Sequence, residues 1–126
     1  MKKHIINTPK APAPIGPYSQ AVKVGKTLYV SGQVAINPAT GDLVLDSIAL
    51  ETKQVMENLK AVLTEGGANF DNVVMTTIFL SDMGSFAAVN EVYGAYFTKD
   101  FPARATVAVK GLPKNVNVEI SVIASL

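Results

Sequence analysis

The sequence predicts an α+β fold, in which one β-sheet carries two α-helices on the same face. Apolar residues alternate in short runs near both ends of the chain, as they do in strands with one buried face. Two stretches in the middle repeat apolar residues at helical spacing, and the run between them is apolar on both faces. The resulting order is several strands, helix, strand, helix and two strands. At 126 residues, the chain is expected to form a single domain, residues 1–126.

The first third of the chain predicts strands joined by turns. A short strand lies around Ile5–Ile6, and the proline-rich segment 9–17 after it is extended or turn-like, because proline disfavours helix in the residue before it. Residues 19–24 and 27–34 read as two strands that turn at Gly25–Lys26. Residues 37–41, with the sequence NPATG, then give a strong turn signal.

The first helix is predicted to start after Asp46 or Ser47 and to run to about Glu65. Both starting residues are good N-caps, and two glycines at 66–67 provide a usual helix end. The apolar stripe of this helix consists of Ile48, Val55, Leu59, Val62 and Leu63.

A strand over residues 72–80 follows, and a second helix begins after Asp82. The strand is apolar on both sides, so we expect it to be buried on both sides. One face of the sheet takes the helices, and another subunit is expected to cover the second face. The second helix carries Phe86, Val89, Tyr93 and Phe97 at helical spacing.

The last quarter of the chain predicts an antiparallel hairpin that brings Arg104 close to Glu119. Residues 104–110 and 116–124 both alternate, and a short loop lies between them. Keeping the apolar residues on one face places Val109 opposite Val116, Val107 opposite Val118 and Ala105 opposite Ile120.

In this register Glu119 lies opposite Thr106, and Arg104 and Glu119 are diagonal neighbours on the polar face, within about 8 Å at Cβ. A fixed guanidinium beside a fixed carboxylate can hold an acidic small molecule and a water. A simple ion pair between the two side chains is the alternative interpretation.

Composition indicates that part of the surface is buried by other subunits. The hydrophobic fraction is 48% and the charged fraction 17%, which is apolar for a small monomer. No apolar run approaches the roughly 20 residues needed to cross a bilayer, so a membrane does not explain this composition. We therefore expect a ring-like homo-oligomer in which Arg104 lies near a seam between subunits.

Charge and cysteine content argue against several classes of protein. The formal net charge is +1 with acids and bases interspersed, so the basic stripe of a nucleic-acid binder is absent. With no cysteine and one histidine, neither a disulfide framework nor a structural zinc site is expected. The basic start of the chain is not followed by an apolar signal region, and we expect a cytoplasmic protein.

Several short motifs are spread along the chain. They are Ile15–Ala21 (IGPYSQA), Ser31–Gln33 (SGQ), Val89–Tyr93 (VNEVY), Phe101–Arg104 (FPAR), Leu112–Lys114 (LPK) and Val118–Ile120 (VEI). In this order they resemble the motifs of the Rid family (reactive intermediate deaminases, also called YjgF), most closely its RidA branch. Together they are far more specific than any one of them alone.

The resemblance implies a chorismate-mutase-like fold and a homotrimer. The three sheets would form a central barrel with the helices outside and ligand clefts between neighbouring subunits. The implied activity is hydrolysis of 2-imino acids, such as 2-iminobutanoate and 2-iminopropanoate, or of their enamine tautomers, to 2-oxo acids and ammonia. No cofactor is implied, and the expected partners are small 2-imino and 2-oxo acids.

The resemblance also assigns roles to two charged residues. Arg104 corresponds to the arginine that binds the substrate carboxylate, a task that suits its planar fork of donors. Glu119 corresponds to the glutamate that holds the attacking water and passes a proton to the departing nitrogen.

Five further positions match residues around the family's cleft. Gly32 would present its backbone N–H to the ligand, Ser31 and Tyr18 would line the cleft, and Asn90 would lie at its edge. Thr106 departs from the pattern, because many family members have cysteine there; we expect it to line the pocket and to contact the ligand through its backbone. Tyr93 and Phe86 are interpreted as core residues.

Two other functions stay open on the sequence. One is a module that binds small carboxylates or oxo acids without turnover, which oxo-acid binding with no rate enhancement would favour. The other is an RNA-directed role, since some relatives have been described as ribonucleases or translation inhibitors. The near-neutral charge argues against it, because phosphate contacts need clustered lysine and arginine.

Overall fold

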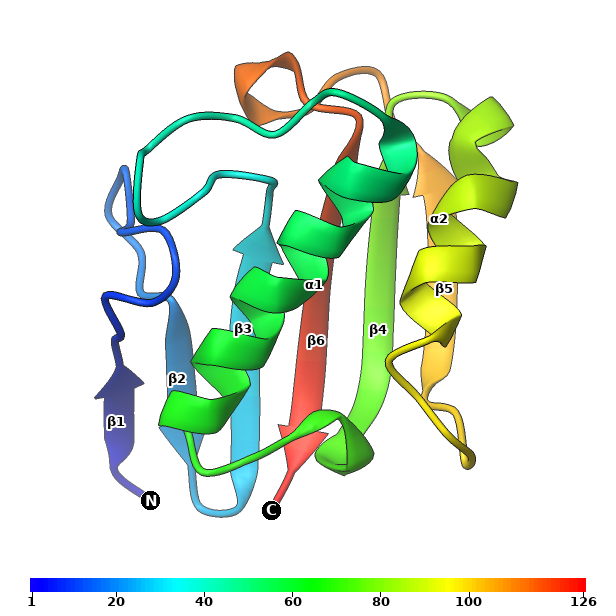
Figure 1. The fold of residues 1–126 in the computed structure, drawn as a ribbon. Helices are drawn as coiled ribbons and strands as arrows, with labels where there is room; N and C mark the ends of the chain where they lie inside the picture. The colour runs from blue at the N-terminus through cyan, green and yellow to red at the C-terminus, as the bar shows by residue number, and fades with distance from the viewer.

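The computed structural model describes all residues, 1–126, and has a single six-stranded sheet with two helices across one face (Figure 1). This confirms the predicted α+β architecture. The strands are β1 (Lys3–Ile6), β2 (Ala21–Val24), β3 (Thr27–Gln33), β4 (Val73–Leu80), β5 (Ala103–Ala108) and β6 (Val118–Ser125); the helices are α1 (Ile48–Glu65) and α2 (Phe86–Gly94). Three short 3₁₀ turns join them: η1 (Phe70–Asn72), η2 (Met83–Ser85) and η3 (Pro113–Asn115).

Helix α1 begins and ends as its sequence predicts, whereas α2 departs from the prediction at both ends. The Ser47 hydroxyl accepts a hydrogen bond from the Leu50 N–H, so Ser47 is the N-cap of α1. Asp82 caps the η2 turn that leads into α2 rather than α2 itself, and its carboxylate accepts from the Gly84 N–H at 2.7 Å. The α2 helix ends at Gly94, one turn earlier than expected.

The core lies between the sheet and α1. Leu59, Val62 and Leu63 are completely buried, and each such side chain stabilises the fold by about 1.5–3 kcal/mol. Their partners on the sheet include Val118, Ile120 and Val122 of β6, which alternate as the sequence predicted. Neither helix has the length and apolar character that a bilayer crossing requires.

The predicted hairpin between the last two strands is wrong. The strand order is β1-β2-β3-β6-β4-β5, so β6 lies between β3 and β4, and β5 lies at the edge (Figure 1). β5 pairs with β4 in parallel, because α2 carries the chain back across the sheet between these two strands. The chain then crosses through η3 and enters β6 beyond β4.

This change of partner also reverses the faces of β5. Directly paired residues point to the same side of a sheet, and Arg104 pairs with Thr76, which is fully buried under α2. Arg104 therefore points to the helix-covered face, whereas Ala105 and Val107 point to the opposite, open face. The alternating pattern correctly predicted that β5 is a strand, but the apolar residues of β5 do not belong to the core of this chain.

The open face of the sheet is partly apolar and uncovered within one chain. Tyr29 and Val74 are each 50% exposed and Val107 is 45% exposed. β4 is thus buried on the helix side alone, and the expected cover of its second face would have to come from outside this chain.

Candidate active site

Arg104 is the only arginine in the chain, and α2 holds it in place. Its Nη1 donates to Asn90 Oδ1 at 2.5 Å. Its guanidinium carbon lies 5.5 Å from the ring centroid of Phe86 and 5.4 Å from that of Tyr93. These are cation–π distances, so two aromatic rings and one amide restrain a side chain that would otherwise be mobile. Phe86 and Tyr93 were expected to be core residues, and in the structure their rings also contact the guanidinium of Arg104.

A second contact anchors this group to the sheet. The Tyr93 hydroxyl donates to Thr76 Oγ1 at 2.9 Å. Burial raises the pKa of Tyr93 above its usual value, although the bond to Thr76 and the charge of Arg104 act in the other direction. Tyr93 therefore stays neutral near pH 7 and keeps its donor. An open hollow of about 520 Å³ lies beside this group, lined by Asn90, Tyr93, Gly94, Phe101, Pro102 and Arg104.

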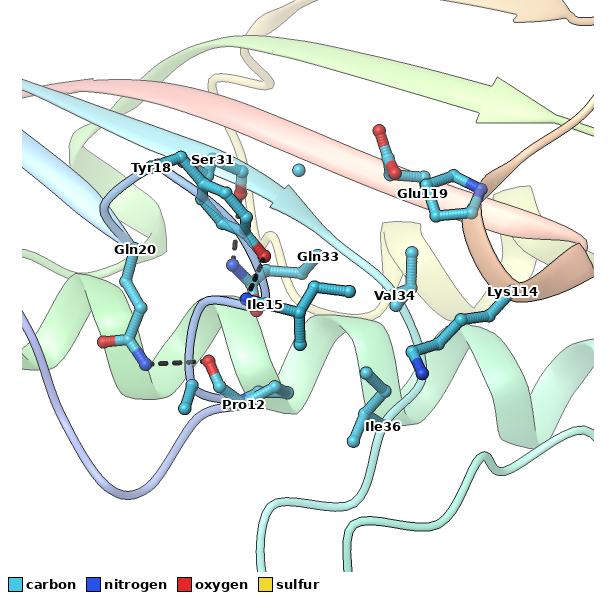
Figure 2. A pocket seen from close by; sticks show the side chains of 13 residues that line it. Pro12, Ile15, Tyr18, Gln20, Ser31, Gln33, Val34, Ile36, Lys114 and Glu119 are labelled. Atoms are coloured by element: carbon cyan, nitrogen blue, oxygen red, sulfur yellow. Dashed lines mark hydrogen bonds between the residues drawn. The ribbon is translucent and has the colours of Figure 1, made fainter.

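Glu119 lies in a different pocket, of about 360 Å³ (Figure 2). We call it the carboxylate pocket. Strands β3 and β6, the proline-rich loop and the η3 turn build its walls. It is lined by Pro12, Ala13, Ile15, Tyr18, Gln20, Ser31, Gly32, Gln33, Val34, Ile36, Pro113, Lys114 and Glu119. Much of the lining is apolar, and Tyr18, Lys114 and Glu119 are its titratable groups.

Gly32 makes room for the Glu119 side chain. A Cβ on Gly32 would lie 2.6 Å from Glu119 Oε2 and 2.8 Å from its Cδ, closer than real Cβ contacts allow. The register of β3 against β6 also shifts between Val30 and Gln33, which is a β-bulge at this point. Gly32 was expected to present its backbone N–H to the ligand; in the structure it lies at a β-bulge, where its missing side chain leaves room for the Glu119 carboxylate.

Burial raises the pKa of the Glu119 carboxyl above its usual range. A carboxylate with a raised pKa is a stronger base than an exposed one and gives up a captured proton less readily. Both properties suit a group that exchanges protons near neutral pH.

Tyr18 and Ser31 line the carboxylate pocket, and the hydroxyl groups of both already make hydrogen bonds. The Ser31 hydroxyl donates to the Ser19 carbonyl at 2.6 Å. The Tyr18 hydroxyl accepts from the Ile15 N–H at 3.4 Å, and the side chain is about half exposed (Figure 2). Their hydrogen bonds shape the entrance formed by the proline-rich loop.

Two buried amides that the sequence interpretation missed fix the walls of this pocket. Gln20, 1% exposed, accepts from the Thr8 N–H at 2.7 Å and donates to the carbonyl of Thr8 and to two carbonyls of the proline-rich loop, one of them that of Pro12 at 2.9 Å (Figure 2). Asn58 of α1 donates to the carbonyls of Val34 and Ile36 at 3.0 and 2.9 Å. An amide within an apolar stripe was the available signal, since a buried polar side chain needs partners.

Within one chain, Arg104 and Glu119 do not face each other, and the expected diagonal pair is wrong. Arg104 pairs with Thr76 of β4, whereas Glu119 pairs with Phe79, three residues farther along the same strand. An odd separation along a strand means opposite faces. The chain therefore carries two half-sites, one around Arg104 under α2 and one around Glu119 in the carboxylate pocket.

Thr106 was predicted to lie opposite Glu119 and to line its pocket, but it lines neither the arginine hollow nor the carboxylate pocket. It pairs with Ile78 of β4 and shares the helix-covered face with Arg104, so it does not lie opposite Glu119. Its Oγ1 is buried and has no hydrogen-bond partner. Asn90, by contrast, lies beside the arginine hollow, where it contacts Arg104 directly. The chain contains no cluster of three or more histidine, cysteine or acidic side chains that could hold a metal ion.

Comparison with known proteins identifies the family. Residues 8–126 match the family model described as Endoribonuclease L-PSP. The crystal structure of RidA from the Antarctic bacterium Psychrobacter sp. PAMC 21119 has a TM-score of 0.94 to this chain at 43% identity, covering 98% of this chain and 99% of that one. The chain belongs to the Rid family.

Curated relatives of this Rid protein carry different names. A RutC family protein of Pyrococcus abyssi is 51% identical over 124 residues, 98% of each chain. The 2-iminobutanoate/2-iminopropanoate deaminase of Mus musculus is 49% identical over 122 residues, 97% of this chain and 90% of the mouse protein. The resemblance read from the sequence motifs is thereby confirmed, and the α+β chain fold is shared with a solved RidA.

Proposed function

We propose that this Rid protein hydrolyses 2-imino acids, or their enamine tautomers, to 2-oxo acids and ammonia. The observation that carries the proposal is a pair of complementary half-sites. One offers a restrained guanidinium for a carboxylate, and the other offers a carboxyl of raised pKa wedged beside a glycine. The deaminase name of the mouse relative supports the same substrate class.

Arg104 is proposed to bind the substrate carboxylate with two parallel, charge-assisted hydrogen bonds. Its restraint by Phe86, Tyr93 and Asn90 favours binding, because little side-chain freedom remains to be lost. Asn90 thus acts on the substrate through Arg104.

Glu119 is proposed to hold the attacking water and to act as the base. It takes a proton from the water as the oxygen bonds to the imine carbon, and it returns this proton to the imine nitrogen, which gives a tetrahedral intermediate with one hydroxyl and one amino group. Glu119 then takes the hydroxyl proton and passes it to the amino nitrogen, so the carbon–nitrogen bond breaks, ammonia leaves and the carbonyl forms. The backbone N–H of Gly32 faces the ligand in this proposal, and Tyr18 and Ser31 form the pocket wall.

The complete site is proposed to form between adjacent copies of the chain in a homotrimer. Arg104 and Glu119 lie on opposite faces of the sheet, so one small molecule cannot bridge them within a chain. β5 is an edge strand, and most of its residues are exposed. The open sheet face beside it carries half-exposed Val74 and Val107, which a neighbour would bury.

The alternatives have less support. Binding of a carboxylate without turnover would need only the arginine half-site. It gives no role to Glu119, whose raised pKa suits a base. RNA cleavage is suggested by names, among them that of the family model, but one arginine and a net charge of +1 make a poor phosphate-binding surface.

The pH dependence of activity tests the role of Glu119. A base must be ionised, so activity falls as the pH drops through its pKa. Because burial raises that pKa, the acid limb of kcat/KM should lie above the ordinary glutamate value of about 4.3. Glu119→Gln should remove this limb and lower the rate by about 10²–10⁴-fold.

The assay couples the protein to a dehydratase that releases 2-iminobutanoate and measures oxo acid and ammonia. The spontaneous rate, measured without the Rid protein at each pH, is subtracted. An unchanged rate in Glu119→Gln, or an acid limb that survives the substitution, would rule out Glu119 as the base.

A further inference from the structure

Glu51 is a completely buried carboxylate that the proposed chemistry does not use. It lies in the first turn of α1 and has an exposed fraction of 0%. Its Oε2 accepts from the backbone N–H of Asn117 at 2.8 Å and of Val118 at 3.0 Å, and its Oε1 accepts from Asn117 Nδ2 at 2.8 Å. An ionised carboxylate is costly to bury, and these three charge-assisted bonds offset that cost.

Glu51 binds the segment Asn117–Val118 at the start of β6, immediately before Glu119. Asn117 is fixed from the other side as well, because Ser81 donates to its carbonyl from N–H at 3.0 Å and to its Oδ1 from the hydroxyl at 3.2 Å. Helix α1 and strand β4 therefore clamp this short segment between them. The segment cannot slide along the sheet without breaking these hydrogen bonds, of which the one from the Val118 N–H to Glu51 is fully buried.

The turn on the other side of the clamp is strained. Lys114 and Asn115 both have left-handed backbones, with φ of 58° and 56°. Each such non-glycine residue costs about 1–3 kcal/mol and persists only where its surroundings hold it. Pro113 and Lys114 of this turn line the carboxylate pocket together with Glu119. The clamp thus lies between two parts of the pocket wall.

We propose that Glu51 is a positioning residue that fixes Glu119 through the backbone of Asn117 and Val118. The proposal rests on the proposed function, since it assigns Glu51 to the same reaction. The Glu119 carboxylate lies close to the backbone of Gly32, so a single carbon added at Gly32 would lie 2.6 Å from its Oε2. Small shifts of β6 therefore change the contacts of this carboxylate. A misplacement of about 1 Å at such a group is enough to cost about 10²-fold in rate.

The chief test is Glu51→Leu, which keeps the apolar packing and leaves two backbone donors without acceptors. At a temperature where the variant is folded, kcat should fall about 10–100-fold with little change in KM, because carboxylate binding by Arg104 is untouched. Glu51→Gln keeps one acceptor oxygen for the backbone donors and should retain most of the activity. In a Glu119→Gln background, Glu51→Leu should add no further loss.

Thr52→Val is the matched control. Thr52 is the next residue of α1, is also completely buried, and donates from its hydroxyl to the Ile48 carbonyl at 2.8 Å. Its replacement should lower stability and leave kcat unchanged. If Glu51→Leu likewise loses only stability, or loses the same factor in the Glu119→Gln background, Glu51 has a structural role and the proposal is wrong.

A measurement without substrate separates this proposal from the proposed function. The pKa of Glu119 can be followed by carboxyl-carbon NMR. A loosened β6 admits water, so Glu51→Leu should lower the raised pKa of Glu119 towards its ordinary value, whereas Thr52→Val should not. The other ionisable side chains that line the pocket with Glu119, those of Tyr18 and Lys114, are the same in both variants.

If Glu51→Leu does not fold, Asn117→Ala carries the same test. It removes one of the three bonds to Glu51 and the bond from the Ser81 hydroxyl, and it leaves the backbone bonds in place, so a smaller loss of kcat and a smaller fall in the pKa are expected. An unchanged Glu119 pKa in this variant would overturn the proposal, even if the protein had no deaminase activity at all.

Discussion

Replacing Arg104 with alanine should abolish nearly all deaminase activity while leaving the fold intact. The variant loses two charge-assisted hydrogen bonds to the substrate carboxylate, each worth about 1.5–3 kcal/mol, so kcat/KM should fall about 10²–10⁴-fold. Arg104 is exposed, and its one hydrogen bond is to Asn90, so the thermal midpoint should change little. The coupled dehydratase assay measures the first effect and a thermal melt the second.

A second substitution at Arg104 separates the two parallel hydrogen bonds of the guanidinium from its positive charge, and a substitution at Lys99 is the control. Arg104→Lys keeps the positive charge but cannot make two parallel bonds, and should recover only part of the lost activity. Lys99→Ala removes an exposed cation outside the arginine hollow and should have no effect. Full activity in Arg104→Ala would refute carboxylate binding by this residue.

Gly32→Ala should inactivate the protein through Glu119. The new Cβ would lie 2.6 Å from Glu119 Oε2, and the end of a flexible side chain moves more easily than the backbone of a paired strand. We therefore expect the glutamate to be displaced, with kcat lowered by about 10²-fold. The thermal midpoint should move by only a few degrees, since about 1 kcal/mol of strain has that effect in a domain of this size.

Gly111→Ala is the control for adding one methyl group at a glycine. A Cβ at Gly111 would meet no atom within 4 Å, so both activity and stability should be those of the parent protein. If Gly32→Ala keeps the parent kcat, the close approach between Gly32 and Glu119 has no part in the reaction.

Local patterns predicted the helices and most strands because their causes are local. Ser47 caps α1 through its own hydroxyl, and the alternation of β6 reflects burial under α1. The pairing of β5 depends on residues that are distant in the sequence, because α2 returns the chain to the side of β4. An alternating strand at an interface also looks the same in sequence as an alternating strand in the core.

The candidate site was predictable residue by residue but not as an arrangement. Motifs pointed to Arg104 and Glu119, and both lie in hollows. Their separation onto opposite faces follows from the strand order, which no short motif encodes. The supporting residues Gln20 and Glu51 also escaped prediction, because their partners are backbone groups distant in the sequence.

The most direct test of a site shared between chains is complementation by two inactive variants. Arg104→Ala and Glu119→Gln are unfolded together, refolded as a mixture and assayed, with each variant refolded alone as the control. If each site takes its arginine from one chain and its glutamate from the next, random assembly restores about a quarter of the sites. A mixture as inactive as its two components would contradict the shared site and the account built on it.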